Sequence, residues 1–107
     1  MAYITVSGQR IEGPGLSKPG VARQLAAGSS SANTVLTSTC ERISIRAEGA
    51  DIRYAIGTSS QTANAGTRHW IADNERLNID VPIGANIGVI RDASADGVLH
   101  VTEFENY

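Results

Sequence analysis

The chain has 107 residues, enough for a single domain with one core that needs no disulfide staples. Hydrophobic residues make up 41% of it, too many for a disordered tail, while its longest apolar stretches are too short for a membrane-spanning helix. The formal net charge of −2, from nine basic and eleven acidic residues, argues against a nucleic-acid-binding protein, which needs a dense basic face.

Residues 1–20 are expected to form an extended N-terminal arm with no fold of its own. This segment ends in GPGLSKPG, where proline and glycine disfavour both a helix and a central strand. Exposed apolar side chains on such an arm need a covering partner. We therefore predict that the apolar residues of the arm contact another subunit: Tyr3, Ile4, Val6, Ile11 and Leu16.

The remaining residues, 21–107, are predicted to form an all-β domain. VARQLAA fits either a helical turn or a strand, and the strand is favoured because the stretch is too short for a stable helix. NTVLT reads as a short strand, and from residue 41 onward apolar and polar side chains alternate with a period of two, as in ERISIRAE and ERLNIDV.

The connections between these strands have the composition of turns. EGAD, ADNE and DASADG supply glycine, asparagine and aspartate, and Pro82 and Gly84 bend the chain between two further strands. GTSSQTANAG is polar and is expected to be a mobile surface loop. Seven or eight short strands at intervals of about ten residues predict a small β-sandwich, either jelly-roll-like or immunoglobulin-like.

Charge is distributed unevenly along the chain. Residues 1–46 carry five basic and two acidic groups, whereas residues 47–107 carry four basic and nine acidic groups. Within one molecule this asymmetry lets strands from the two halves pair. In an assembly it favours contact between arginines of one subunit and carboxylates of its neighbour, because the arginine fork holds a carboxylate in two hydrogen bonds.

One segment matches the pattern of a calcium-binding loop. Asp92, Ser94 and Asp96 precede Gly97, and Glu103 stands at the twelfth position. That loop needs a helix on each side, whereas NIGVIR and VLHVTEF look like strands. We therefore predict a β-hairpin here, with no metal bound.

Other residues with reactive side chains are few and scattered. His69 and His100 lie in strand patterns, and Cys40 is expected to be a small buried hydrophobe. Zinc needs three or four ligands, and these three residues stand far apart in the sequence. No serine lies in a glycine-flanked elbow, and no glycine-rich phosphate loop precedes a helix. The sequence predicts no catalytic residue and no cofactor.

Trp70 is the only tryptophan, and in a small sandwich it is expected to fill the core. The alternative is an exposed platform on which a sugar stacks. If Trp70 points inward, Ile71 points outward, so we predict that Ile71 belongs to a subunit interface on this strand.

Two stretches, ERISIRAEGADIRYAIG and VPIGANIGVIRDASADGVLHVTE, resemble a group of small β-sandwich structural proteins of tailed-bacteriophage virions. The resemblance covers roughly residues 41–104 and leaves the arm uncovered. It implies a virion structural protein and transfers no catalytic residue. The commonest role in this group is a head decoration or cement protein, and others sit at the head–tail connector, collar or tail.

These considerations together predict a non-enzymatic, homo-oligomeric protein that binds the major capsid protein or other virion subunits. Because MAYITVSGQR lacks the features of a signal peptide, we expect synthesis in the host cytoplasm, with no membrane partner. A connector, collar or tail accessory subunit is the alternative within this class. A carbohydrate-binding module that uses Trp70 is the alternative from another class, and a small hydrolase ranks last.

Overall fold

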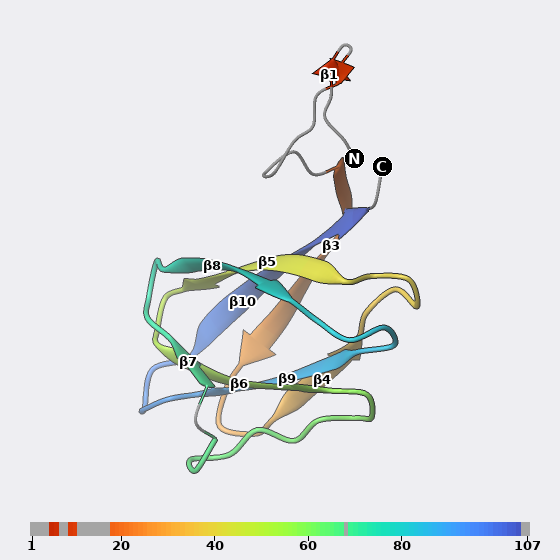
Figure 1. The fold of residues 1–107 in the computed structure, drawn as a ribbon. Coiled ribbons are helices and arrows are strands. Elements are labelled where there is room, and N and C mark those ends of the chain that lie inside the picture. The colour runs from red at the N-terminus through yellow and green to blue at the C-terminus, as the bar shows by residue number, and fades with distance from the viewer. Residues whose placement is uncertain (1–4, 7–8, 11–17, 68, 106–107) are drawn as a thin grey trace.

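A computed structural model of the protein describes residues 5–6, 9–10, 18–67 and 69–105, which form strands and loops (Figure 1). Among the described residues there is no helix long and apolar enough to cross a membrane. The strands are β1 (Thr5–Val6), β2 (Gln9–Arg10), β3 (Lys18–Ala27), β4 (Ala32–Val35), β5 (Arg42–Glu48), β6 (Ile52–Gly57), β7 (His69–Ile71), β8 (Arg76–Asp80), β9 (Asn86–Arg91) and β10 (Gly97–Glu105). The predicted all-β fold is confirmed.

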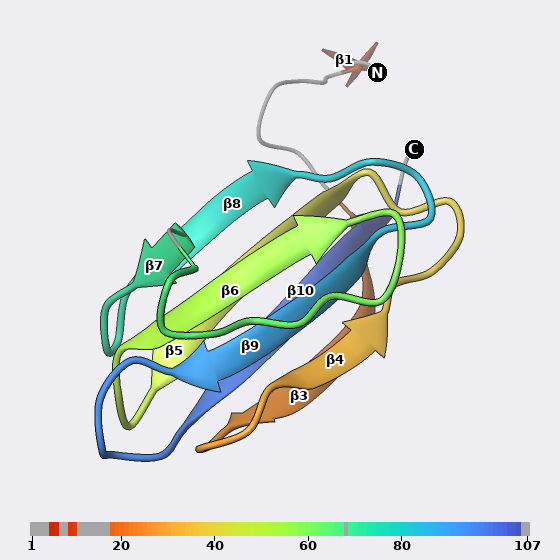
Figure 2. The ribbon, with the colours of Figure 1, turned by 90° about the horizontal axis from the view of Figure 1, so that it is seen from below.

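Eight of these strands build two stacked four-stranded sheets (Figure 2). The first sheet has the order β3-β10-β5-β8 and the second has the order β4-β9-β6-β7. Each strand pairs with the strand at the mirrored place in chain order, so that β3 pairs with β10, β4 with β9, β5 with β8 and β6 with β7. This is the double Greek key of a jelly roll, one of the two sandwich types that the sequence predicted.

The core lies between the inner faces of the two sheets. It is formed by the apolar members of the alternating patterns, since successive side chains of a strand point to opposite faces. Its largest fully buried side chains are Ile43, Ile45, Ile52, Ile71, Ile87, Val89, Leu99 and Val101. On the outer face of the first sheet, the residues between them in sequence are mostly polar, as the period of two predicted.

The first strand of the sandwich begins earlier than expected. β3 starts at Lys18, so residues 18–20 of the predicted arm belong to this strand, in which Lys18 and Pro19 pair with Glu105 and Phe104 at the end of β10. The strand prediction for 21–27 is confirmed. Pro19 fits here because β3 is an edge strand, where a missing amide donor breaks no ladder.

The two ends of the sandwich differ. β3 begins and β10 ends at one end, which we call the arm end (Figure 1). The β4–β5 and β8–β9 connections also lie at the arm end, where the amide of Leu36 donates to the carbonyl of Ala85 at 2.9 Å. The opposite end carries the turns in which Gly49 and Asn74 adopt positive φ values of 92° and 67°. Glycine and asparagine tolerate this conformation, which is why these turns were predictable.

Candidate binding surfaces

Trp70 lies on the outer face of the second sheet, opposite to the prediction. Its side chain is 45% exposed, whereas Ile71 is fully buried. The register explains the reversal, because Ile71 lies directly opposite Ile52, whose place in the core is set by the alternation of β6. The expectations that Trp70 fills the core and that Ile71 points outward to an interface are therefore wrong.

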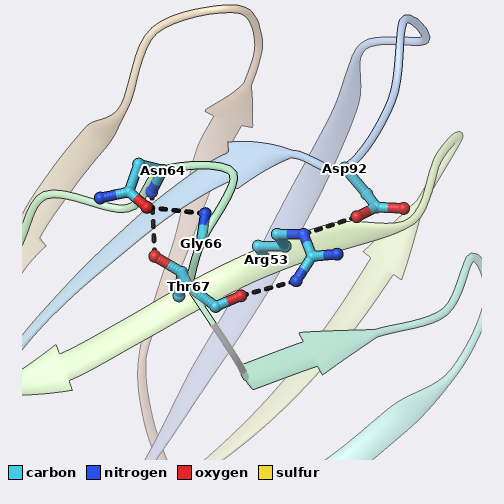
Figure 3. Close-up of polar contacts among 5 residues, drawn as sticks. All are labelled: Arg53, Asn64, Gly66, Thr67 and Asp92. Atoms are coloured by element: carbon cyan, nitrogen blue, oxygen red, sulfur yellow. Dashed lines mark hydrogen bonds and ion pairs between the residues drawn. The ribbon is translucent and has the colours of Figure 1, made fainter.

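Arg53 is the cross-strand neighbour of Trp70. Figure 3 shows the contacts that its guanidinium group makes with Asp92 and Thr67. Its Nε donates to Asp92 Oδ1 at 2.6 Å, and its Nη1 donates to the carbonyl oxygen of Thr67 at 2.6 Å. The side chains of Arg53 and Asp92 are 29% and 24% exposed. Arg53 thus connects the turn after β9 with the β6–β7 connection. These two contacts fix the shape of the outer surface beside Trp70.

The connection between β6 and β7 lies across the outer face of the second sheet (Figure 2). Its Gln61 amide donates to Asn33 Oδ1 at 2.8 Å, its Ala63 amide donates to Ser31 Oγ at 2.9 Å, and the Ala63 side chain is buried. A Cβ on Gly88 would lie only 2.5 Å from the carbonyl oxygen of Gln61. The expectation of a mobile loop therefore does not fit, because hydrogen bonds hold the backbone of this segment at Gln61, Ala63 and Thr67.

Asn64 shapes the last turn of this connection. Its side-chain Oδ1 accepts a hydrogen bond from the backbone amide of Gly66 at 2.8 Å, and its backbone amide donates to Thr67 Oγ1 at 2.9 Å (Figure 3). The Thr67 amide closes the turn by donating to the Asn64 carbonyl at 2.9 Å. This turn fixes the position of the Thr67 carbonyl, which accepts the hydrogen bond from Arg53. The β6–β7 connection and the surface around Trp70 therefore form one unit.

A second polar cluster lies inside the sandwich near the arm end. Glu103 points inward and is 3% exposed, and its Oε2 accepts hydrogen bonds from Arg23 Nε at 2.9 Å and from the Thr37 amide at 3.0 Å. Burial raises the pKa of the Glu103 carboxyl, but hydrogen bonds from Thr37 and Arg23 outweigh burial, so the pKa lies below its ordinary value.

The structure separates the residues that match the calcium-loop pattern. Asp92 pairs with Arg53 in the turn after β9, whereas Glu103 stands near the far end of β10 with Arg23. The strands on both sides are confirmed, but the predicted β-hairpin is wrong, because β9 pairs with β4 and β6 in the second sheet and β10 pairs with β3 and β5 in the first, so that the turn between them crosses from one sheet to the other. In the part of the chain that the structure describes, no three His, Cys, Asp or Glu side chains converge as a metal site would need.

The two histidines and the cysteine each have a local partner. The His69 ring stacks on that of Tyr54 at 5.4 Å, and His100 Nε2 lies 2.6 Å from Glu48 Oε1. Cys40 is buried, and its thiol donates to the Arg42 carbonyl at 3.4 Å. Burial raises the pKa of the Cys40 thiol, which keeps it protonated and matches the predicted small hydrophobe.

Large apolar side chains are exposed at the arm end. They are Val21 in β3, Val35 at the end of β4 and Ile83 in the β8–β9 turn, with exposed fractions of 46%, 57% and 62%. Val21 shares the inward-facing side of β3 with Leu25, but it lies closer to the start of the strand, where it is no longer buried. The sequence analysis missed these residues, although Val35 and Ile83 border turns, where side chains are rarely covered.

The structure describes only one of the arm residues that were predicted to contact a partner. Tyr3, Ile4, Ile11 and Leu16 lie outside the described residues. Val6 lies in β1, which pairs with β2 in a two-stranded antiparallel ladder where Val6 is opposite Gln9. The segment that contains them leads directly into β3, whose second edge pairs with no other strand among the described residues.

No protein-family model, no curated protein and no solved structure matches this chain. Its surfaces must therefore be interpreted from their own geometry.

Proposed function

We propose that this chain is a non-enzymatic structural subunit of a tailed-bacteriophage virion, and that it decorates or cements the lattice of the major capsid protein as an oligomer. The observation that carries the proposal is the arm end. There an open edge strand continues into a segment rich in apolar residues, beside the exposed side chains of Val21, Val35 and Ile83. Strand edges and arms of this kind join subunits by adding a strand to a neighbour.

The rest of the molecule is consistent with a protein that acts by binding. Glu103 and Arg53, which stand at the centres of the two polar clusters, are both occupied by structural partners. The jelly roll recurs in viral shells and in lectins, so the fold alone does not choose between them. The resemblance over residues 41–104 favours the virion. A connector, collar or tail accessory subunit would use the same arm end at another position in the particle.

Particles of the phage that carries this gene provide the test. Wild-type protein should co-sediment with heads that lack it and appear as density on the capsid lattice. A variant with Val21→Ser, Val35→Ser and Ile83→Ser should remain folded and bind far fewer particles, because the apolar contact is lost. The matched control is Trp70→Ser, which changes an exposed apolar side chain on the outer face of the second sheet, away from the arm end, and should bind normally. Wild-type protein that fails to join heads or tails contradicts the proposal.

Exposure of Trp70 favours carbohydrate binding as the second candidate function. The indole stands on a surface held rigid by Arg53, and sugars stack on such exposed aromatic faces. Titration with bacterial surface oligosaccharides should quench the fluorescence of this single tryptophan. Trp70→Ala should abolish binding and cost less than about 1 kcal/mol of stability, as is usual for surface positions. Absence of quenching by any glycan removes this candidate.

A further inference from the structure

A row of polar side chains crosses all four strands of the first sheet on its outer face. Gln24 lies opposite His100, His100 lies opposite Arg46, and Arg46 lies opposite Arg76. The residues on either side of this row in sequence point inward, among them the buried Ile45 and Leu99. The four side chains of the row therefore share the solvent face.

Arg46 and Arg76 are two like charges in directly opposed positions. Such pairs repel each other and weaken a sheet, so they are unexpected unless something compensates for the charge. Arg46 Nη2 donates to Asn74 Oδ1 at 3.1 Å and Arg76 Nη1 donates to Ser44 Oγ at 3.1 Å, and both acceptors are neutral. Within the described residues, neither guanidinium forms an ion pair with a carboxylate.

Two carboxylates that are close to these arginines in the sequence have other hydrogen-bond partners. Glu48 lies 2.6 Å from His100, which with a smaller contribution from the charge of Arg46 lowers the pKa of Glu48. Glu75, the sequence neighbour of Arg76, accepts a hydrogen bond from the Ala72 amide at 2.9 Å. The two guanidinium groups thus keep most of their donors available, since each has five N–H groups.

Arg42 provides an internal comparison on the same face. It lies opposite Asp80, and its Nε is 3.0 Å from Asp80 Oδ1, the arrangement expected for a charge pair that stabilises a sheet. The same two strands therefore pair one arginine with an acid and oppose the other two arginines to each other. Arg46 and Arg76 are thus the two arginines of these strands that form no ion pair among the described residues.

We propose that Arg46 and Arg76 form a docking point for carboxylates on the surface of another protein subunit. This inference rests on the proposed function and deepens it, because it names the chemistry of the partner surface. Two adjacent guanidinium forks match side-chain carboxylates in geometry and charge. A nucleic-acid backbone is a poorer match, because the face also carries Glu48 and Asp80 and holds no dense basic stripe.

The full-length protein and fluorescently labelled poly-L-glutamate provide the test, read out by fluorescence anisotropy at low and high salt. Wild-type protein should bind the polymer, and high salt should weaken binding. A variant with Arg46→Gln and Arg76→Gln should lose about tenfold or more in affinity, the effect of two charge-assisted contacts. The matched control, Arg42→Gln with Asp80→Asn, should stay within about twofold, because that pair is already neutralised.

A second variant separates charge from geometry. Arg46→Lys with Arg76→Lys keeps both charges and loses the forks, so its affinity should fall between wild type and the glutamine variant. Thermal melts should show all variants folded. The proposal is overturned if wild type does not bind poly-L-glutamate, if the control variant loses as much affinity as the glutamine variant, or if single-stranded DNA or inorganic phosphate competes at lower concentration. Because no particle is used, failure to join virions is a separate result that bears only on the proposed function.

Discussion

At the residue scale, Glu103 shows how a charge is accommodated inside this small sandwich. β10 turns the side chain inward, where an unpaired carboxylate would be strongly destabilising. Arg23 and Thr37 supply donors from two other segments, β3 and the β4–β5 connection. One buried carboxylate therefore connects the edge strand β3 and a loop to β10, an inner strand of the first sheet.

The pH dependence of stability should reveal this role. Because the folded-state pKa of Glu103 lies below the unfolded value of about 4.3, its contribution is present above that pH and is lost as the pH falls through the folded pKa. Glu103→Gln should cost about 1.5–3 kcal/mol at neutral pH, as for hydrogen bonds to charged groups, and the cost should shrink on acidification. Urea unfolding of both proteins across this pH range measures the difference. A cost that stays constant with pH would contradict it.

The control for this measurement is Glu105→Gln. Glu105 pairs with Lys18 at 3.4 Å, and both side chains are more than half exposed, so the substitution should change stability little at any pH.

At the element scale, most strands were predictable and the packing of one connection was not. Period-two alternation and turn residues located β5, β6, β8, β9 and β10, because one face of each strand is apolar and each turn carries its own chemistry. β7 has only three residues, and two of them are large and apolar, so alternation alone assigned Trp70 and Ile71 to the wrong faces. The face to which each side chain of β7 points is set by the pairing of Ile71 with Ile52, a contact between strands that the local sequence pattern does not encode.

The prediction of a mobile β6–β7 connection was wrong for a related reason. Its polar composition is that of a free loop, and nothing local shows that Asn33 and Ser31 hold its backbone. Gly88 was the one signal in the sequence, because a glycine inside a strand often marks the close approach of another backbone. The sequence analysis also missed that Arg46 lies opposite Arg76, since this depends on how β5 and β8 align.

Gly88→Ala tests whether this close approach matters. An added Cβ would lie 2.5 Å from a backbone atom of Gln61, so the connection must shift. We expect a loss of about 1–3 kcal/mol from overpacking, larger than the gain of about 0.4–1 kcal/mol that a Gly→Ala change otherwise brings. Hydrogen exchange at the Gln61 and Ala63 amides should also accelerate.

Gly28→Ala is the matched control for that substitution. The nearest atom to its added Cβ is Asp96 Oδ1 at 3.9 Å, which is ordinary contact, and its stability should not fall. If both variants are equally stable and exchange is unchanged, the connection does not depend on Gly88.

At the scale of the whole molecule, the jelly roll makes the chain ends interdependent. The first strand of the sandwich, β3, pairs with the last, β10. Apart from the separate β1–β2 pair, the described residues contain only one ladder between strands adjacent in sequence, β6 with β7. Nearly all pairing therefore joins distant parts of the sequence. Such a topology folds slowly compared with one built from local contacts, and it tolerates the loss of a segment only where that segment adds nothing to the core.

Two N-terminal truncations locate the boundary between arm and fold. Removal of residues 1–17 keeps all of β3 and every residue of the described core, so Tm should change by less than about 4 °C. Removal of residues 1–24 also deletes Arg23 and most of the β3–β10 ladder, leaving Glu103 buried without its cation. That loss should lower Tm by about 10 °C or more, or prevent folding. Circular dichroism melts measure both, and sedimentation should show that the shorter truncation alone yields a folded protein with weakened assembly. If removing residues 1–17 unfolds the domain, the N-terminal segment belongs to the fold itself and is not an arm that serves a partner.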